Sequence, residues 1–218
     1  MKKKILILGG GLSKERQISL QTAKQVKSIL KKKYRVIQAD FNKDLENKIK
    51  KFKPDIVFNA LHGRFGEDGF VQSILEFLKV KYTHSGVISS ALAMDKVASK
   101  KIFKKNKILT PKFIKLTNSN QIIENLKKIK KNFSFPVVIK PINEGSSVDV
   151  FICSEKNIKK HLIKLKNYNE ILVEEYIGGR EIQAAILGKM KLGIIELIPK
   201  RKFYDYKAKY NSSAKTKH

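Results

Sequence analysis

The chain has 218 residues, 42% of them hydrophobic, so it can form a core that buries about 70% of the unfolded surface. Its formal net charge is +28, but only five of the 47 basic residues are arginine, and the lysines are spread along the whole chain. A specific nucleic-acid site would be richer in arginine and confined to one face, so composition argues against nucleic acid as a specific partner.

The first part of the chain alternates apolar strands with amphipathic helices. Strands are predicted at residues 4–8, 34–39 and 55–59, and helices at residues 19–32 and 45–52. Ser13 is predicted as the N-cap of the first helix. This alternation predicts a parallel sheet covered by helices, with ligands bound beyond the carboxyl ends of the strands.

The second part begins with a lysine-rich helix at residues 94–106 and then changes character. Strands are predicted at residues 112–116, 136–140, 149–153, 171–175, 181–187 and 191–198, and helices at residues 119–131 and 155–166. Short turns such as Gly178–Gly179 predict antiparallel pairing. The fold class is therefore a parallel α/β domain over residues 1–93, followed by an antiparallel α+β domain over residues 94–218.

The single cysteine, Cys153, lies in an apolar run and is predicted to be a small buried hydrophobic residue. A chain with one cysteine forms no internal disulfide, which suits the reducing cytoplasm. No apolar run approaches the ~20 residues of a membrane span, and the basic start is not followed by a signal-peptide core. We expect a cytoplasmic protein without a membrane partner.

Two loops follow predicted parallel strands. Gly9–Gly11 could leave backbone N–H groups free for an anion or could simply form a tight turn, and it matches neither the dinucleotide fingerprint nor the P-loop. Glu15 is either a charge near a helix start or an anchor for a substrate ammonium group. The loop at residues 60–69 combines three glycines with His62 and several charges, a combination that favours function.

In the second part, Lys140 ends an apolar strand, where it needs an anionic partner such as a nucleotide phosphate. The turn Glu144–Ser147 follows, and its N–H groups and hydroxyls suit phosphate oxygens. Glu174 and Glu175 end another apolar strand, either as solvated charges or as acceptors for a ribose or adenine group. The run 204–210 holds three tyrosines and two lysines and could form a lid.

These residues resemble the motifs of the D-alanine–D-alanine ligases, a family of the ATP-grasp superfamily. The matching segments, in order, are 9–19, 60–63, 66–69, 85–86, 93–96, 138–141, 144–148 and 203–210. The resemblance implies a Rossmann-like pre-ATP-grasp domain over residues 1–93. It implies an ATP-grasp domain from residue 94, with a central subdomain at about 107–177 and the start of a C-terminal subdomain at 178–218.

The resemblance also implies a reaction. ATP phosphorylates the carboxylate of one D-alanine, the amine of a second D-alanine attacks the acylphosphate, and phosphate leaves as the dipeptide forms for peptidoglycan synthesis. The implied catalytic residues, joined by hydrogen bonds, are Glu15, Ser146 and Tyr210. The implied substrate-binding residues are Glu15, His62, Ser146 and Tyr210. The implied ATP-binding residues are Lys96, Lys140, Glu144, Ser146, Ser147, Glu174, Tyr176, Ile177, Glu181 and Lys209.

Within this set, Glu174 is expected to bind the adenine amine and Glu181 the ribose, while Lys209 closes over the phosphates. Asp149 stands where the family usually has glycine, and a carboxylate that faced the phosphates would weaken ATP binding. Family members continue beyond Tyr210, and that part supplies the ligands of magnesium or manganese. We therefore expect these ligands beyond His218 and expect the 218-residue chain to be a fragment that cannot turn over.

Other readings remain open from the sequence. The acceptor could be the hydroxyl of D-lactate or an amine other than that of D-alanine, the chain could be a non-catalytic ATP-binding remnant, or its charge could serve nucleic-acid binding. A homodimer formed through the first domain is expected from the family.

Overall fold

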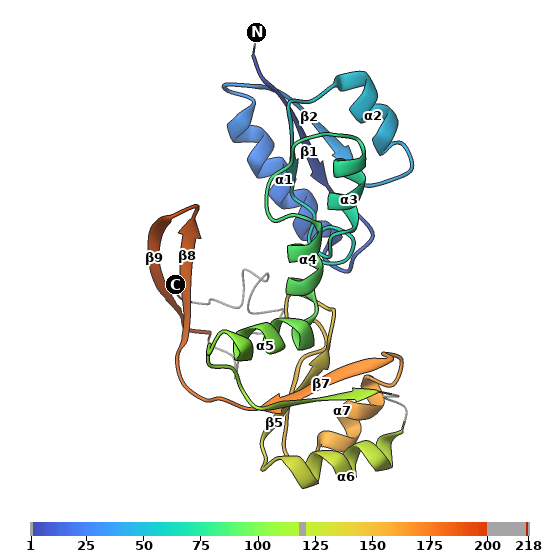
Figure 1. Ribbon diagram of the computed structural model, residues 1–218, viewed down its shortest axis with the longest axis vertical. Coiled ribbons are helices and arrows are strands. Elements are labelled where there is room, and N and C mark those ends of the chain that lie inside the picture. The colour runs from blue at the N-terminus through green and yellow to red at the C-terminus, as the bar shows by residue number, and fades with distance from the viewer. Residues whose placement is uncertain (1, 118–120, 200–216, 218) are drawn as a thin grey trace. The chain divides into compact units, whose positions relative to one another are not determined.

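The computed structural model describes residues 2–117, 121–199 and 217, and it divides into two compact units, Met1–Ser99 and Lys100–His218 (Figure 1). Each unit contains its own sheet and its own apolar core. Within the described ranges, no helix combines the length and apolar character needed to cross a bilayer.

The first unit contains the predicted parallel sheet, with strand order β2-β1-β3. Its strands are β1 (Lys4–Gly9), β2 (Arg35–Asp40) and β3 (Ile56–Asn59). The central strand β1 is apolar from Ile5 to Leu8 because both of its faces are covered there. Ile5 and Ile7 pack in one cluster with Ala23 of α1 (Arg16–Leu30), whereas Leu6 and Leu8 pack in another.

The apolar cluster that contains Leu6 and Leu8 also includes side chains of two helices. Helix α2 (Leu45–Phe52) supplies Leu45 and Ile49, and helix α3 (Phe70–Phe77) supplies Val71 and Leu75. The side chains of β1 alternate between the two clusters because successive residues of a strand point to opposite faces. The sheet and the helices on its two faces fix the positions of the loops that leave the carboxyl ends of β1 and β3.

The predicted helix at 94–106 corresponds to α5 (Lys96–Lys105), and a helix that was not predicted, α4 (Val87–Met94), precedes it. Asp95 separates them with an extended backbone (ψ 106°). Its Oδ1 accepts hydrogen bonds from the backbone N–H groups of Val97 at 2.8 Å and Ala98 at 2.9 Å. Asp95 thus acts as the N-terminal cap of α5, a role that aspartate favours.

The prediction that Ser13 caps the first helix is wrong. Helix α1 begins at Arg16, and the residue before it is Glu15. The Ser13 hydroxyl instead accepts the backbone N–H of Glu15 at 3.1 Å and donates to the carbonyl of His62 at 2.7 Å. It therefore joins the loop after β1 to the loop after β3.

The second unit contains the predicted antiparallel sheet, with strand order β4-β7-β5-β6. Its strands are β4 (Phe113–Thr117), β5 (Val137–Pro141), β6 (Phe151–Cys153) and β7 (Glu170–Glu175). Helices α6 (Ile122–Asn132) and α7 (Ile158–Lys164) lie on the same side of this sheet (Figure 1).

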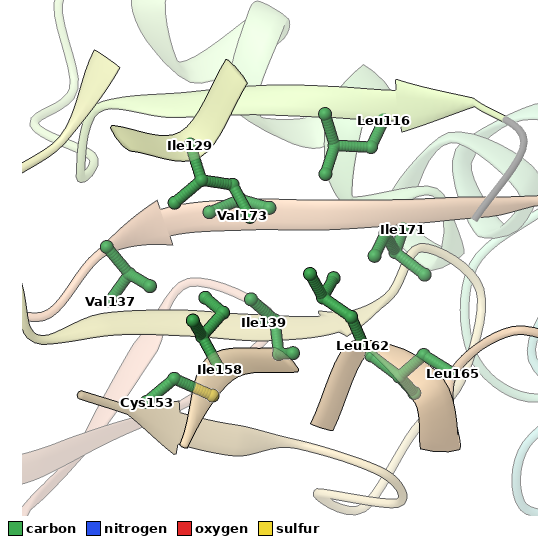
Figure 2. Packing of buried hydrophobic residues seen from close by; sticks show 10 residues of the cluster. All are labelled: Leu116, Ile129, Val137, Ile139, Cys153, Ile158, Leu162, Leu165, Ile171 and Val173. Carbon is green, nitrogen blue, oxygen red and sulfur yellow. The ribbon is translucent and has the colours of Figure 1, made fainter. Parts of the chain in front are cut away.

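Figure 2 shows the core that these elements enclose. Val137, Ile139 and Val173 point from the sheet toward Ile129, Ile158 and Leu162 of the two helices, and each of these six side chains is buried. Cys153 is fully buried in the same cluster, as the sequence predicted. Alternation along β5 and β7 therefore sends Lys140 and Glu174 to the face of the sheet opposite these helices.

A hairpin of β8 (Glu181–Leu187) and β9 (Met190–Leu197) follows, paired from Glu181 opposite Leu197 to Leu187 opposite Met190. Every residue of β8 is exposed. Large apolar side chains of the hairpin are exposed as well, namely Ile182, Ile186, Leu187, Met190, Leu192, Ile194 and Ile195. The hairpin thus carries apolar residues without a buried face of its own.

Candidate functional site

The loops after β1 and β3 in the first unit are joined by buried hydrogen bonds. The backbone N–H of Gly10 donates to Ser19 Oγ at 2.8 Å, and that hydroxyl donates to the carbonyl of Ala60 at 2.7 Å. The Ser13 bond to His62 adds a second connection. The parallel sheet therefore brings two of the predicted motifs together at one edge.

The glycine turn itself has the geometry of a tight turn. Gly10 and Gly11 have φ angles of 95° and 81°, which favour glycine. The N–H of Gly11 donates to Asp40 Oδ1 at 2.8 Å, and Arg16 forms an ion pair with Asp40 at 2.6 Å. Burial alone would raise the pKa of Asp40, but Arg16 and the N–H of Gly11 outweigh it and hold that pKa below its ordinary 3.8. Because the N–H groups of Gly10 and Gly11 are both used internally, the structure favours the tight-turn interpretation over an anion cradle.

Glu15 is buried, with 4% of its surface exposed. Gly63 has a φ of 68°, and a methyl group at its Cα would lie 2.7 Å from Oε2 of Glu15. The carboxylate therefore lies against the backbone of the second loop and is not a solvated charge at the helix start. A buried carboxylate at a loop junction is suited to hold a cationic group.

His62 forms a hydrogen-bonded cluster with Thr22 and Glu67. Its Nε2 lies 3.1 Å from Thr22 Oγ1, and its Nδ1 lies 3.6 Å from a carboxylate oxygen of Glu67. Glu67 raises the pKa of His62 above 6.5, against the opposing effect of burial, and Glu15 adds to the increase. Burial alone would raise the pKa of Glu67, but His62 and the N–H of Gly63 outweigh it and bring it below 4.5.

A cavity of about 300 Å³ opens beside this cluster within the first unit. It is lined by Thr22, Phe58, Asn59, Ala60, Leu61, His62, Gly66, Glu67, Gln72, His84, Ser85, Ser90 and Ala93. The cavity lies beyond the carboxyl end of β3, where ligands bind in parallel α/β sheets. Its volume and its mixture of apolar and polar groups suit a molecule of amino-acid size.

In the second unit, Glu174 lies between two lysines. Its Oε1 forms a short ion pair with Lys140, and its Oε2 lies 2.8 Å from Nζ of Lys100. Glu174 is buried, so the interpretation of Glu174 as a strand-end charge in water is wrong, whereas Glu175 is exposed. Strand pairing explains the arrangement, because Glu174 on β7 stands opposite Val138 on β5, two residues before Lys140.

The turn after β5 contains three non-glycine residues in the left-handed region. Ser146, Ser147 and Asp149 have φ angles of 47°, 60° and 54°, which L-residues adopt only at a cost. The hydroxyl of Tyr168 donates to Asp149 Oδ2 at 2.5 Å and to Glu144 Oε1 at 3.5 Å. The side chain of Asp149 is therefore held by Tyr168, and the predicted strand at 149–153 begins only at Phe151.

The remaining predicted residues are placed as follows. Lys96 is the first residue of α5, Tyr176 and Ile177 are exposed just after β7, and Glu181 is exposed at the start of β8. Lys209 and Tyr210 lie outside the described residues. Glu15, His62 and Lys96 belong to the first unit, whereas Lys140, Glu144, Ser146, Ser147, Glu174, Tyr176, Ile177 and Glu181 belong to the second.

Two residues of the clusters in the second unit, Lys100 and Tyr168, were not among the predicted site residues. Lys100 follows Lys96 by four residues, so both lie on one face of a helix, and this spacing is the only sequence signal for it. Tyr168 has no comparable signal, because its partners Glu144 and Asp149 precede it by a strand and a helix.

Comparison with known families and proteins assigns both parts of the chain to one family. The family model for the C-terminus of D-Ala–D-Ala ligase matches residues 102–218, more than half of the chain. The model for the N-terminus of the same ligase matches residues 39–85.

Individual relatives give the same result. The D-alanine–D-alanine ligase of Pelagibacter ubique is 63% identical over all of this chain, which spans 72% of that protein. A crystal structure of D-alanine–D-alanine ligase from Bacillus anthracis is 35% identical, with a TM-score of 0.79, over 99% of this chain and 70% of that one. A second crystal structure of that ligase, in complex with ATP, is 31% identical with a TM-score of 0.75, over 94% of this chain and 68% of that one. This chain belongs to the D-alanine–D-alanine ligase family.

Proposed function

We propose that this protein joins two D-alanines into D-alanyl-D-alanine at the expense of ATP, by way of an acylphosphate, for peptidoglycan precursor synthesis. The observation that carries the proposal is the 63% identity with a D-alanine–D-alanine ligase over the entire chain. The two polar clusters support it, since each contains the residue types that one half of such a reaction needs.

The first cluster suits an amino acid. Glu15 presents a buried carboxylate for the ammonium group of the first D-alanine, and a charged partner there replaces the water that burial removes. His62 carries more positive charge near neutral pH than an ordinary histidine, because Glu67 raises its pKa. It therefore serves as the partner of the substrate carboxylate, and the adjacent cavity of about 300 Å³ accommodates the alanine.

The second cluster suits a nucleotide. Lys140 and Lys96 hold phosphate oxygens, Ser146 and Ser147 cover them with N–H and hydroxyl groups, and Glu174 accepts from the adenine amine. Tyr176 and Ile177 contact the base through their backbone groups, and Glu181 holds the ribose. The charge of the second unit supports this assignment, because Lys140 and Lys100 surround the single carboxylate of Glu174 and leave a net positive charge for the phosphates.

Phosphoryl transfer needs little covalent help from a protein, so positioning and positive charge account for most of the acceleration. The lysines bring the γ-phosphoryl group to the carboxylate that Glu15 and His62 hold in place. The hydrogen-bonded link of Glu15, Ser146 and Tyr210 orients the reactants, and Lys209 closes over the phosphates. Closure protects the acylphosphate from water until the second amine attacks.

A divalent cation is expected with ATP, because phosphate oxygens and carboxylates are the preferred ligands of magnesium. Within residues 2–117, 121–199 and 217, no group of three or more histidine, cysteine, aspartate or glutamate side chains could hold a metal. The described part of the chain therefore does not fit a resident metal, and its residues act here through their own charges.

The first unit corresponds in this proposal to the substrate domain and the second to the ATP-grasp domain. The protein works in the cytoplasm as a homodimer formed through the first unit. Support for the dimer comes from the exposed apolar side chains of Leu12, Phe70 and Phe77, of which Leu12 and Phe77 line a groove of about 610 Å³. D-alanine and ATP are its small-molecule partners.

The test measures ATP binding by calorimetry with the 218-residue chain, and dipeptide formation with the product of the complete reading frame. We expect ATP binding by the chain, and D-alanyl-D-alanine as the main product when D-alanine and D-lactate compete. A depsipeptide product would identify a D-lactate acceptor instead. ATP binding without any product would identify a non-catalytic binder, and no binding at all would contradict the proposal.

A further inference from the structure

The buried Glu174 carboxylate is shared by two lysines that differ in their surroundings. Side-chain exposure is 9% for Glu174, 8% for Lys100 and 19% for Lys140. Each lysine takes a different carboxylate oxygen, Lys140 at Oε1 and Lys100 at Oε2. Such a triad carries one positive charge more than the carboxylate neutralises.

Lys100 is held in place by groups other than Glu174. Its Nζ donates to Thr110 Oγ1 at 2.7 Å and to the carbonyl of Pro111 at 3.2 Å, and it lies 5.1 Å from the centre of the Phe113 ring. All three donor positions of an ammonium group are thus used. Lys140 is more exposed, and among the described residues its ion-pair partner is Glu174.

The sheet explains why one lysine is fixed and the other is not. Glu174 lies on the central strand β7, opposite Phe113 of β4 on one side and Val138 of β5 on the other. Lys140 reaches it along the same face of β5, near the end of that strand. Lys100 reaches it from α5, where its neighbours Thr110 and Pro111 belong to the segment that connects α5 to β4.

We propose that Lys100 is a positioning residue that keeps Glu174 in place as the acceptor for the amino group of adenine while Lys140 transfers from Glu174 to the phosphates. This inference rests on the proposed function, because it takes ATP as the ligand of the cluster. It goes beyond that function by explaining how one carboxylate serves first a lysine and then a base.

The physical reason is the cost of a buried charge without a partner. When Lys140 leaves, Oε1 becomes free to accept from the adenine amine, and Lys100 still neutralises the carboxylate at Oε2. Without Lys100, departure of Lys140 would leave a buried carboxylate with no cation, which is strongly unfavourable. Lys140 would then stay on Glu174, and both the base contact and the phosphate contact would weaken.

The test compares ATP with inosine triphosphate, which carries a carbonyl oxygen in place of the adenine amine and cannot donate to Glu174. Dissociation constants are measured by calorimetry on the full chain for wild type, Lys100→Met and Lys100→Arg. Lys101→Met is the matched control, because Lys101 is its exposed neighbour on α5. Circular dichroism and thermal unfolding verify that each variant is folded.

We expect wild type and Lys101→Met to prefer ATP over inosine triphosphate by about 10- to 100-fold, the range of a hydrogen bond to a charged group. Lys100→Met loses most of this preference and binds ATP about 10-fold or more weakly, whereas Lys100→Arg restores part of both. In a protein that already carries Glu174→Gln, adding Lys100→Met lowers the preference for ATP no further, because Lys100 acts through Glu174.

A folded Lys100→Met variant that keeps the wild-type preference for ATP overturns the inference and leaves the proposed function intact. Should Lys100→Met fail to fold, the comparison is made with Lys100→Gln, and an unchanged preference there overturns the inference equally. Absence of ATP binding by the wild-type chain is a different outcome, which overturns the proposed function and, with it, the role of Lys100.

Discussion

The carboxylate of Glu15 lies directly against the α-carbon of Gly63, so closely that a methyl group on that carbon would lie 2.7 Å from Oε2. The two residues come from loops that follow different strands, and Ser13 fastens the loops together through its bond to the carbonyl of His62. A side chain at this point would force the carboxylate to shift, and the φ of 68° at Gly63 also favours glycine. The position of the proposed substrate anchor therefore depends on a residue without a side chain.

Replacement of Gly63 by alanine is expected to displace Glu15 and to impair D-alanine binding. The left-handed backbone costs an alanine about 1–2 kcal/mol, and the contact with Oε2 adds to this cost. D-alanine affinity falls about 10-fold or more, the loss expected for a misplaced charged hydrogen bond. Calorimetry measures the affinity, and unchanged ATP binding serves as the control. Wild-type affinity for D-alanine in Gly63→Ala would show that the contact is unimportant.

Glu15→Gln tests the anchor itself without a change of shape. The amide keeps the size of the side chain but removes the charge that pairs with an ammonium group. We expect D-alanine affinity to fall by about 10- to 100-fold, while ATP affinity changes less than twofold. Glu46→Gln is a matched control, because Glu46 is an exposed acid on α2 of the same unit. Equal effects of the two substitutions would contradict the assigned role.

The His62–Glu67 pair is expected to make stability depend on pH in a defined window. His62 has a raised pKa, so its contribution is complete below 6.5 and disappears as the pH rises through its folded value. Glu67 has a lowered pKa, so its contribution is present above 4.5 and disappears as the pH falls through its folded value. The pair therefore stabilises the fold most between pH 4.5 and pH 6.5, the ordinary pKa values of glutamate and histidine.

Urea unfolding of wild type and His62→Gln measures this effect. The variant is expected to be less stable by at most about 1 kcal/mol near pH 5.5, since the pair is partly exposed. The difference becomes small near about pH 8.5, where the histidine is neutral in both the folded and the unfolded state. A difference that stays constant between these two conditions would show that packing, and not charge, accounts for the loss.

Asp149→Gly tests the position in the turn after β5 where this chain has aspartate and the family usually has glycine. Glycine accepts the φ of 54° without cost, but the substitution removes the bond from Tyr168, so we expect a stability change below about 1 kcal/mol. Loss of one negative charge near the phosphates strengthens ATP binding about twofold to fivefold. Asp149→Asn is the control, because asparagine tolerates the backbone and also lacks the charge. Weaker ATP binding in both variants would contradict this reasoning.

Cys153 is expected to be unreactive in the folded protein. It is fully buried, and burial raises the pKa of its thiol to about 12. Iodoacetamide at about pH 8 should leave the native chain unmodified and label it once after unfolding. Cys153→Ser should lower the free energy of unfolding by about 1–3 kcal/mol, because a hydroxyl is buried in an apolar cluster. Rapid labelling of the native chain would show that this core opens readily.

The strands and their pairing could be predicted from the sequence because their apolar runs report burial directly. β1 is apolar from Ile5 to Leu8 and is buried on both faces, while Val137 and Ile139 of β5 point toward one core. Helix α5 lies within the predicted helix at 94–106, but α4 escaped prediction, because its eight residues are too short a stretch to show a clear helical period.

The polar contacts could be predicted only in part. Motif resemblance singled out Lys140 and Glu174, but the structure adds that Glu174 forms ion pairs with both Lys140 and Lys100. In a chain with 47 basic residues, the four-residue spacing from Lys96 is too common to distinguish the buried Lys100 from its solvated neighbours. The left-handed backbone at Ser146, Ser147 and Asp149 had no sequence signal either, because glycine normally marks such positions.

The hairpin of β8 and β9 has a consequence for the dynamics of the second unit. Two strands that are exposed along most of their length have little burial to oppose local opening, since isolated hairpins are marginal in water. Their amide protons should therefore exchange with deuterated solvent far sooner than those of β5 and β7, whose protection approaches that of global unfolding. We therefore expect one polypeptide to combine a slowly exchanging sheet with a hairpin whose amide protons exchange early.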